Sequence, residues 1–180
     1  MAFKLNPFTS QLDTVRNQML WGSFYDTTQQ IATAANTAYS VGINSTDPDS
    51  QGISIASGSR ITFSRAGVYS ITYSVQFVNT STSIHDVNIW LRKNDSGASG
   101  DVPASDSKFS VISSHGGVDG FIIGCVNYVL KLAANDYLEL IWSTTNVATS
   151  IQSLPASPSG PAHPSIPGII LTAVQVALCL

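Results

Sequence analysis

Strict alternation of apolar and polar residues between Tyr69 and Phe77 constrains the fold more than any other feature of this sequence. Every odd position carries an aromatic or branched side chain, and every even position carries a small or polar one. Because successive side chains of a β-strand point to opposite faces, this pattern predicts a strand with one buried face. The alternation recurs at Val87–Leu91 and Leu138–Trp142, whereas helical periodicity is almost absent after residue 20. The chain is therefore predicted to be all-β.

Shorter segments separated by turn residues extend this pattern along the chain. Clusters rich in Gly, Pro, Asn, Asp and Ser, such as Asp47–Gly52 and His115–Gly117, lie between them. About ten strands at this spacing, with no helix to connect parallel strands, predict a β-sandwich or barrel. Besides the three segments above, the predicted strands are Ile31–Val41, Ile53–Ala56, Arg60–Phe63, Lys108–Ser113, Phe121–Leu132, Thr145–Gln152 and Ile166–Ala177.

The end of the last predicted strand, Ile169–Leu178, is apolar on both faces. Such a strand must lie centrally in the sandwich and must also be covered from outside, by a loop or by a neighbouring subunit. Charged residues make up only 11% of the 180 residues, against roughly 25% in a typical soluble domain. Together these features predict a folded domain that associates with other chains.

Charge and motif content argue against several functional classes. The net charge is −3, and no basic cluster exists that could bind nucleic acid. Motifs for nucleotide binding, zinc binding and nucleophilic catalysis are missing, and the adjacent pair His85–Asp86 would point to opposite faces of a strand. Loop aspartates are possible calcium ligands, but their spacing does not match an EF-hand loop. We expect no enzyme activity, no cofactor and no metal site.

No segment approaches the roughly 18 apolar residues that a membrane-spanning helix needs, so we expect no membrane insertion. The first residues lack the basic start and apolar run of a secretory signal, which predicts synthesis in a cytoplasm. Cys125 and Cys179 lie in apolar segments and are expected to be buried free thiols; a disulfide between them is the alternative.

Two segments interrupt the strand pattern. Residues 153–168 hold five prolines spaced every third residue, which suits polyproline II. We expect a surface loop there, with a ligand segment for another protein as the alternative. Met1 to about Leu20 is too irregular for a domain and is predicted to be an arm that orders on a partner. Residues 1–27 would form the arm and linker, and residues 28–180 the domain. The predicted anchors are Phe3, Leu5, Asn6, Pro7, Phe8 and Leu12.

Trp90 is the aromatic residue whose position most suggests contact with another molecule. It alternates with Val87, Ile89 and Leu91, so it should lie on the outer face of its strand. Burial in a subunit interface is the favoured interpretation, and stacking on a host-surface glycan is the alternative. Trp142 shares a face with other apolar residues of its strand and is predicted to lie in the core.

The segment Gly67–Tyr73 resembles the G-x-Y-x-F-x-[FY] motif of C1q-like domains, which belong to the C1q and tumour-necrosis-factor superfamily. Gly67, Tyr69 and Tyr73 match that motif, while Ile71 stands where Phe is usual. Ile61 stands where the family has a Phe six residues before the glycine. We expect Gly67 to lie in a turn with a positive φ.

A second segment, Leu132–Leu140, resembles the family pattern L-x-x-G-D-x-V-x-L, with Asn135 in place of Gly and Asp136 matching. The resemblance covers about residues 28–178. It implies a C1q/TNF-like jelly-roll β-sandwich of about ten strands that forms a homotrimer.

The N-terminal segment Lys4–Asp13 resembles the N-P-F-T-G-x-L-D opening of small structural proteins of tailed phages, with Ser10 where Gly is usual. This likeness implies a virion structural protein on the particle surface, whose arm binds capsid or tail proteins. A capsid decoration protein or head fibre is the first hypothesis. A tail-fibre or receptor-binding module that recognises a host glycan is the second, and a secreted C1q-like recognition protein is the third.

Overall fold

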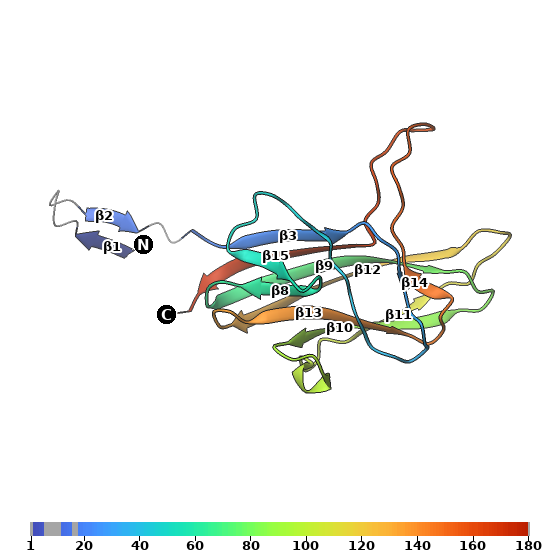
Figure 1. The fold of residues 1–180 in the computed structure, drawn as a ribbon, viewed down its shortest axis with the longest axis horizontal. Helices are drawn as coiled ribbons and strands as arrows, with labels where there is room; N and C mark the ends of the chain where they lie inside the picture. Colours follow the sequence, from blue (N-terminus) through green and yellow to red (C-terminus); the bar gives the residue numbers. More distant parts are fainter. Residues whose placement is uncertain (1, 6–11, 16–17, 180) are drawn as a thin grey trace.

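The computed structural model describes residues 2–5, 12–15 and 18–179, which form a sandwich of two antiparallel sheets and an N-terminal hairpin outside it (Figure 1). Within these residues no α-helix occurs, and a single 3₁₀ turn is present at Ala98–Gly100. The predicted all-β jelly-roll sandwich is confirmed.

One sheet is built around its longest strands, β9 and β12, which pair along their whole length. On its other edge β9 pairs with β15 and, beyond the start of β15, with β14. β3 then pairs with β15, β6 with β3, and β4 with β14. β15 therefore lies between β9 and β3, central in its sheet as predicted. The seven strands are β3 (Trp21–Asp26), β4 (Gln30–Ile31), β6 (Ser45–Thr46), β9 (Gly67–Asn79), β12 (Gly120–Leu132), β14 (Thr149–Ile151) and β15 (Ile169–Leu178).

The other sheet has six strands in the order β11-β10-β13-β8-β7, with β5 pairing with part of β13. All of its neighbours are antiparallel. The strands are β5 (Tyr39–Ser40), β7 (Ile53–Ala56), β8 (Arg60–Phe63), β10 (His85–Lys93), β11 (Ser107–Val111) and β13 (Tyr137–Thr144).

The core lies between the two sheets and follows the alternation read from the sequence. Tyr69, Ile71 and Tyr73 of β9 point inward and are fully buried, as is Trp142 of β13. The phenyl ring of Phe77 and the indole of Trp142 are 6.3 Å apart between centroids, so the two sheets meet through aromatic contacts. Tertiary burial of one face therefore explains why these segments form strands.

The segment Ile31–Val41, predicted as one strand, is instead two short strands in different sheets. β4 belongs to the seven-stranded sheet and β5 to the six-stranded sheet, so the chain crosses between the layers here. Asn36 has a φ of 55° in the connecting turn, a backbone conformation that a continuous strand does not contain. Apolar residues stand at both ends of this segment, but the turn at Asn36 separates them into two elements.

The predicted boundary between arm and domain at residue 27 is also wrong. β3 lies within residues 1–27, yet it is an integral strand of the seven-stranded sheet. Leu20, just before β3, is buried, and its N–H donates to Gln175 Oε1. The strand was missed because its inward positions are Gly22, Phe24 and Asp26, which do not form an apolar series.

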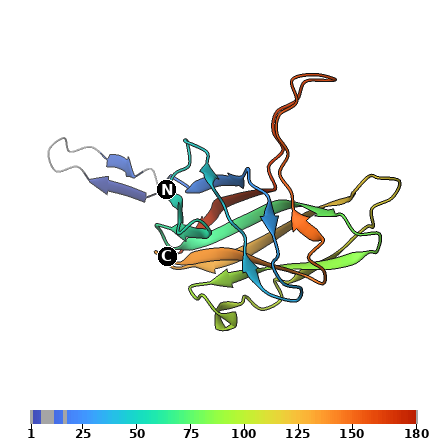
Figure 2. The same cartoon turned by 45° about the vertical axis from the view of Figure 1, so that its right-hand side comes forward.

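The N-terminal arm contains a two-stranded hairpin that the sequence did not predict. β1 (Ala2–Leu5) and β2 (Leu12–Val15) pair antiparallel, with Leu5 opposite Leu12. Figures 1 and 2 show this hairpin lying away from the sandwich. Of the predicted anchors, Asn6, Pro7 and Phe8 lie outside the described residues, as do the side chains of the other three.

The proline-rich segment 153–168 is a surface loop, as expected, but its two arms run side by side. Bridges between Leu154 and Ile166 and between Ser157 and His163 hold it as a narrow hairpin. Figures 1 and 2 show it standing out from the sandwich. Antiparallel pairing replaces the polyproline II helix suggested by the proline spacing.

Candidate functional site

The outer face of the seven-stranded sheet carries apolar side chains that are left exposed in the described chain. Inward and outward positions alternate along β12 and β15, and most of the outward positions are apolar; the exceptions are Asn127, Lys131 and Thr172. Ile123, for example, is 67% exposed and Val129 is 61% exposed. The exposed apolar residues of this face are Phe121, Ile123, Val129, Ile170, Val174 and Val176. We call this surface the apolar face.

Strand register sets how the apolar face is organised. β9 lies in the middle and contributes small polar residues, with Ser70 opposite Val129 on one side and Val174 on the other. One row further along, Thr72 lies between Asn127 and Thr172. Asn127 Nδ2 donates to Thr72 Oγ1 at 2.6 Å and to Ser70 Oγ at 2.9 Å. The polar groups of this row therefore pair within the chain, which lowers the cost of covering them.

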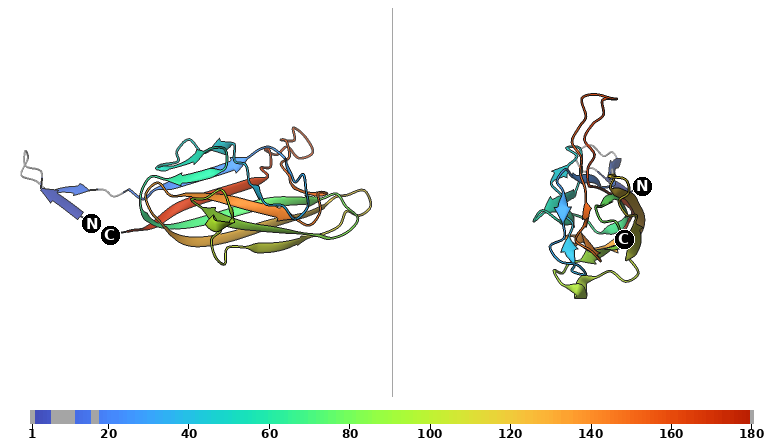
Figure 3. Two further views of the ribbon diagram at one scale, coloured as in Figure 1. Left: turned by 60° about the horizontal axis from the view of Figure 1, so that its bottom comes forward. Right: turned by 90° about the vertical axis from the view of Figure 1, so that its right-hand side faces the viewer.

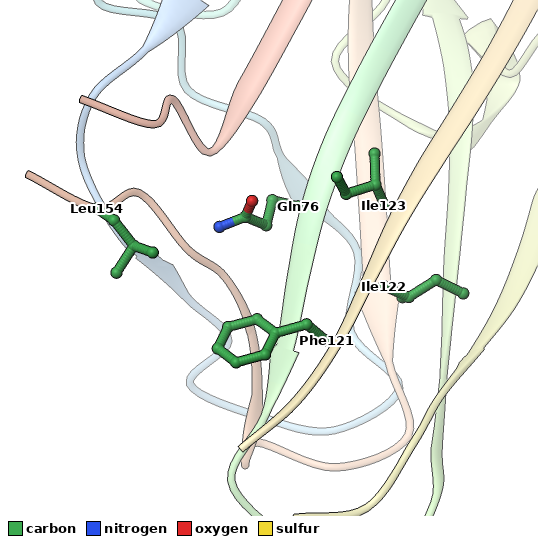
Figure 4. A pocket seen from close by; sticks show the side chains of 5 residues that line it. All are labelled: Gln76, Phe121, Ile122, Ile123 and Leu154. Carbon is green, nitrogen blue, oxygen red and sulfur yellow. The ribbon is translucent and has the colours of Figure 1, made fainter. Parts of the chain in front are cut away.

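A hollow of about 420 Å³ lies at one end of the apolar face, where β12 meets the base of the proline-rich hairpin. Figure 4 shows Gln76 and Phe121 extending toward Leu154, while Ile122 points to the other side of β12. Gln76 Nε2 donates to Gln152 O at 3.4 Å, so the amide helps to hold the base of the loop. The hollow is a recess of the apolar face and has little polar chemistry of its own.

The outer face of the six-stranded sheet is different, because charged side chains pair across it. Lys108 Nζ lies 2.7 Å from Asp86 Oδ2. Arg92 Nε lies 2.7 Å from Asp101 Oδ1, and the Arg60 guanidinium lies 4.5 Å from the centre of the Tyr137 ring. This face suits contact with water, whereas the apolar face suits contact with another protein surface.

Trp90 lies on this polar face, on the side of β10 opposite the core, as the sequence predicts. A second hollow, of about 350 Å³, lies beside it and is also lined by Asn88, Asp101, Val102, Asp106 and Ser143. Trp90 Nε1 is buried and forms no hydrogen bond of ordinary geometry in the described chain, although it is close enough to Asp101 to lower the pKa of that carboxyl. Trp90 is thus on the sheet opposite the apolar face.

Four of the residues matched to the C1q-like motifs are core residues: Ile61, Tyr69, Ile71 and Tyr73 are all buried. Tyr69 Oη also donates to Arg65 O at 2.7 Å, and its ring packs edge-on against that of Phe63 at 4.7 Å. Burial raises the pKa of Tyr73 well above its ordinary value. These residues support the fold and offer no reactive group at the surface.

Gly67 is needed for a different reason from the one predicted. Its φ is not among the positive values, and it starts β9 as an ordinary strand residue. An added Cβ would instead fall on Gln175 Nε2 and lie 3.0 Å from Ala177 O. The glycine therefore allows a close approach between β9 and β15, and the predicted turn conformation is wrong.

Asn135 and Asp136 form the turn between β12 and β13. Asn135 has a φ of 67°, a left-handed conformation that glycine adopts most readily, which is consistent with the Gly at this place in the C1q-like pattern that the segment resembles. Asp136 accepts hydrogen bonds from Asn94 Nδ2 at 2.6 Å, from Ala133 N at 2.8 Å and from Lys93 Nζ at 3.2 Å. Burial alone would raise the pKa of this carboxyl, but these hydrogen bonds outweigh it and lower the pKa below its usual range.

Cys125 is exposed on β12 and Cys179 is half-buried; both are free thiols. The expectation that both are buried is wrong for Cys125, which takes an outward position between Ile123 and Asn127 on the apolar face. The apolar neighbours that suggested burial belong to a strand whose outward side is largely apolar as well.

Among the described residues, no group of three or more His, Cys, Asp or Glu side chains is arranged to hold a metal ion. His115 lies in a tight turn, bridged to Val118, and His163 lies in the proline-rich hairpin. The described part of the chain also contains no helix long and apolar enough to cross a membrane.

Comparisons with known proteins define the fold and leave the family open. No protein-family model and no curated protein matches this sequence. Among solved structures, the Eiger TNF protein from S. frugiperda is similar, with a TM-score of 0.57 over 90% of this chain and 95% of that chain, at 11% sequence identity. A likeness at this identity concerns the fold alone. The chain thus has a TNF-like jelly-roll β-sandwich.

Proposed function

We propose that this chain is a non-enzymatic structural protein of a tailed-bacteriophage virion. It forms a homotrimeric knob on the particle surface, anchored by its N-terminal arm, and serves as a capsid decoration protein or head fibre. The observation that carries the proposal is the exposed apolar face of the seven-stranded sheet, combined with an arm that lies outside the sandwich.

The apolar face supports self-association. Its core carries no charged side chain, and Lys131 is the charged residue at its margin on β12. Burying the exposed part of an Ile or Val side chain contributes about 1 kcal/mol, so several such residues from each subunit provide a favourable free energy that opposes the entropic cost of association. TNF-like folds usually assemble as trimers, which favours that stoichiometry over a dimer.

The arrangement of the chain ends supports attachment to a surface. β3 begins where β15 approaches its end, because Trp21 pairs with Val174, so the arm leaves the sandwich at this end (Figure 3). The loops at residues 80–84 and 112–119 lie at the opposite end, beyond Asn79 and Gly120. In a symmetric trimer three arms would emerge together, and three linked attachments bind far more tightly than one.

A deletion of residues 1–17 tests the anchoring role. The truncated protein keeps Leu20 and β3, so we expect unchanged β-type circular dichroism and an unchanged oligomeric mass. Co-sedimentation with particles of the parent phage that lack the protein should be lost. Val118→Ser, a change in a loop at the other end, should leave co-sedimentation intact. Particle binding by the truncated protein equal to that of the full chain would exclude the arm as the anchor.

The alternative function is a tail-fibre or receptor-binding module that recognises a host-surface glycan. The hollow beside Trp90 favours it, because an aromatic ring there lies among hydrogen-bonding side chains on the polar face. Binding to host cells in the absence of phage particles would support this function, whereas binding only to particles supports decoration.

A further inference from the structure

We propose that the hollow beside Trp90 binds a single neutral hexopyranose unit, which stacks on the indole ring and donates its hydroxyls to the surrounding carboxylates. This inference rests on the alternative function above, glycan recognition, and names its ligand class; it does not depend on the decoration role.

Sheet geometry brings the first part of the site together. Asn88 and Trp90 lie two residues apart on β10, so their side chains share the outer face. Ser143 of β13 is the cross-strand partner of Asn88. Three lining residues therefore stand on paired strands at the middle of a sheet, where the backbone is rigid and a ligand would meet a preformed surface.

The loop that follows β10 supplies the acidic part. It folds back along the strand edge, with Val102 N donating to Leu91 O at 2.9 Å and Ser105 Oγ holding Leu91 N at 3.0 Å. These bonds fix Asp101 and Asp106 on either side of Val102 and Ser105, at the rim of the hollow. The carboxylates are thus positioned by buried backbone contacts and do not depend on a ligand for their placement.

The hydrogen-bonding capacity of the hollow matches sugar hydroxyls. Asn88 Nδ2 donates to Asp106 Oδ2 at 2.8 Å, and this bond holds the amide and the carboxylate together at the wall of the hollow. Asp101 is engaged by Arg92 through one oxygen. Its partial burial would raise its pKa, but Arg92, through its hydrogen bond and its charge, and the Trp90 N–H together outweigh this and keep the pKa below its usual range, so the carboxylate accepts hydrogen bonds at neutral pH.

The charge of the hollow selects against acidic sugars. Two carboxylates line it, and the nearby Arg92 already forms an ion pair with Asp101, so a sialic or uronic acid would meet net negative potential. A neutral pyranose has an apolar ring face for Trp90 and several hydroxyl donors for the aspartates. A volume of about 350 Å³ is at the lower end for a ligand site and suits one ring.

The test uses the full chain with four neutral probes: methyl β-D-galactopyranoside, methyl α-D-glucopyranoside, methyl α-D-mannopyranoside and N-acetylglucosamine. N-acetylneuraminic acid is the anionic comparison. Binding is followed by saturation-transfer NMR and titration calorimetry. At least one neutral probe should bind with a dissociation constant on the order of 1 mM. Trp90→Ala should weaken that binding at least tenfold, while Trp90→Phe should retain part of it.

A matched control is Tyr137→Ala, which removes an aromatic side chain from the same outer face but outside the hollow. This variant should bind the neutral sugar with the same affinity as the unmodified chain. If Trp90→Ala does not fold, Asp106→Ala at an exposed loop position carries the test, with an expected loss of at least threefold. The proposal is overturned if no neutral probe binds, if the tested hollow variant binds as the unmodified chain does, or if N-acetylneuraminic acid binds most tightly.

Discussion

Gly67 shows how one residue without a side chain can control the pairing of two central strands. Gln175, which an added Cβ would displace, accepts a hydrogen bond from Leu20 N and donates one to Ala66 O. Gly67→Ala should therefore lower the free energy of unfolding by about 1–3 kcal/mol, because it breaks buried hydrogen bonds that have no replacement. Urea denaturation measures this change.

Gly97→Ala is the control for that substitution. Gly97 has a φ of −116°, and an added Cβ would meet its nearest neighbours at 3.7 and 3.9 Å, which is ordinary contact. Its free energy of unfolding should change by less than about 0.5 kcal/mol. Equal effects at both positions would mean that the close approach of β9 and β15 does not depend on glycine.

Asp136 makes part of the stability depend on pH. Its folded-state pKa is lowered, so its stabilising effect is present above the unfolded pKa of about 3.9 and is lost as the pH falls through the folded value. Asp136→Asn should lower the free energy of unfolding at pH 7 by about 1–3 kcal/mol. The variant should also lose less stability than the unmodified chain between pH 4 and pH 2. Melting curves across this range, with exposed Asp119→Asn as control, check both effects.

At the scale of strands, the sequence predicts those that bury a regular series of apolar side chains. It does not predict strands whose buried positions include glycine or polar residues, or strands of only two residues. The inner faces of β9, β10 and β13 meet the core and carry apolar residues at every second position, so the sequence predicts these strands. β3 buries a glycine and an aspartate, and β4 and β5 are too short for a period. The boundary of the domain was misplaced for this reason alone.

Of the two candidate sites, one could be predicted in part from the sequence and the other could not. The sequence predicts the apolar face in part from β15, and β12, where most outward positions are apolar as well, carries the same signal. The hollow beside Trp90 could not be predicted, since it depends on how residues 94–106 fold back along β10. Pattern identifies which face of a strand is apolar, whereas loop geometry decides which polar groups meet.

The apolar face of β12 permits a direct test of assembly. Ile123 is 67% exposed, so Ile123→Asp should leave the single-chain fold intact. In an assembly the new charge would be buried unpaired, at a cost of several kcal/mol for each subunit. Light scattering should show the mass falling to that of one chain. Ile84→Asp, at a loop position that is 62% exposed, should leave the oligomeric mass unchanged. An undiminished mass in the Ile123 variant would place the interface elsewhere.

At the scale of the whole molecule, the low charge and the two unlike outer faces favour an assembly in which the apolar faces of the subunits meet. The six-stranded sheet carries ion pairs and the seven-stranded sheet carries apolar residues, so association through the latter leaves the former in water. All arms then lie at one end of the assembly and the loops of residues 80–84 and 112–119 at the other. This polarity suits a knob that is fixed at one end.

The proposed trimer should become more stable as the protein concentration rises, and its mass should not depend on the salt concentration. Because the proposed trimer would bury the apolar face and the unfolded chain would not, the melting temperature should rise with protein concentration by mass action. Ion pairs contribute little to that face, so the mass in light scattering should stay near three times the 19.0 kDa of one chain even in about 1 M NaCl, where the Debye length is about 3 Å. Calorimetry over a hundredfold range of concentration checks the first effect. A melting temperature that does not change over that range, together with a mass near 19.0 kDa, would show that the chain works as a monomer and that another protein covers its apolar face.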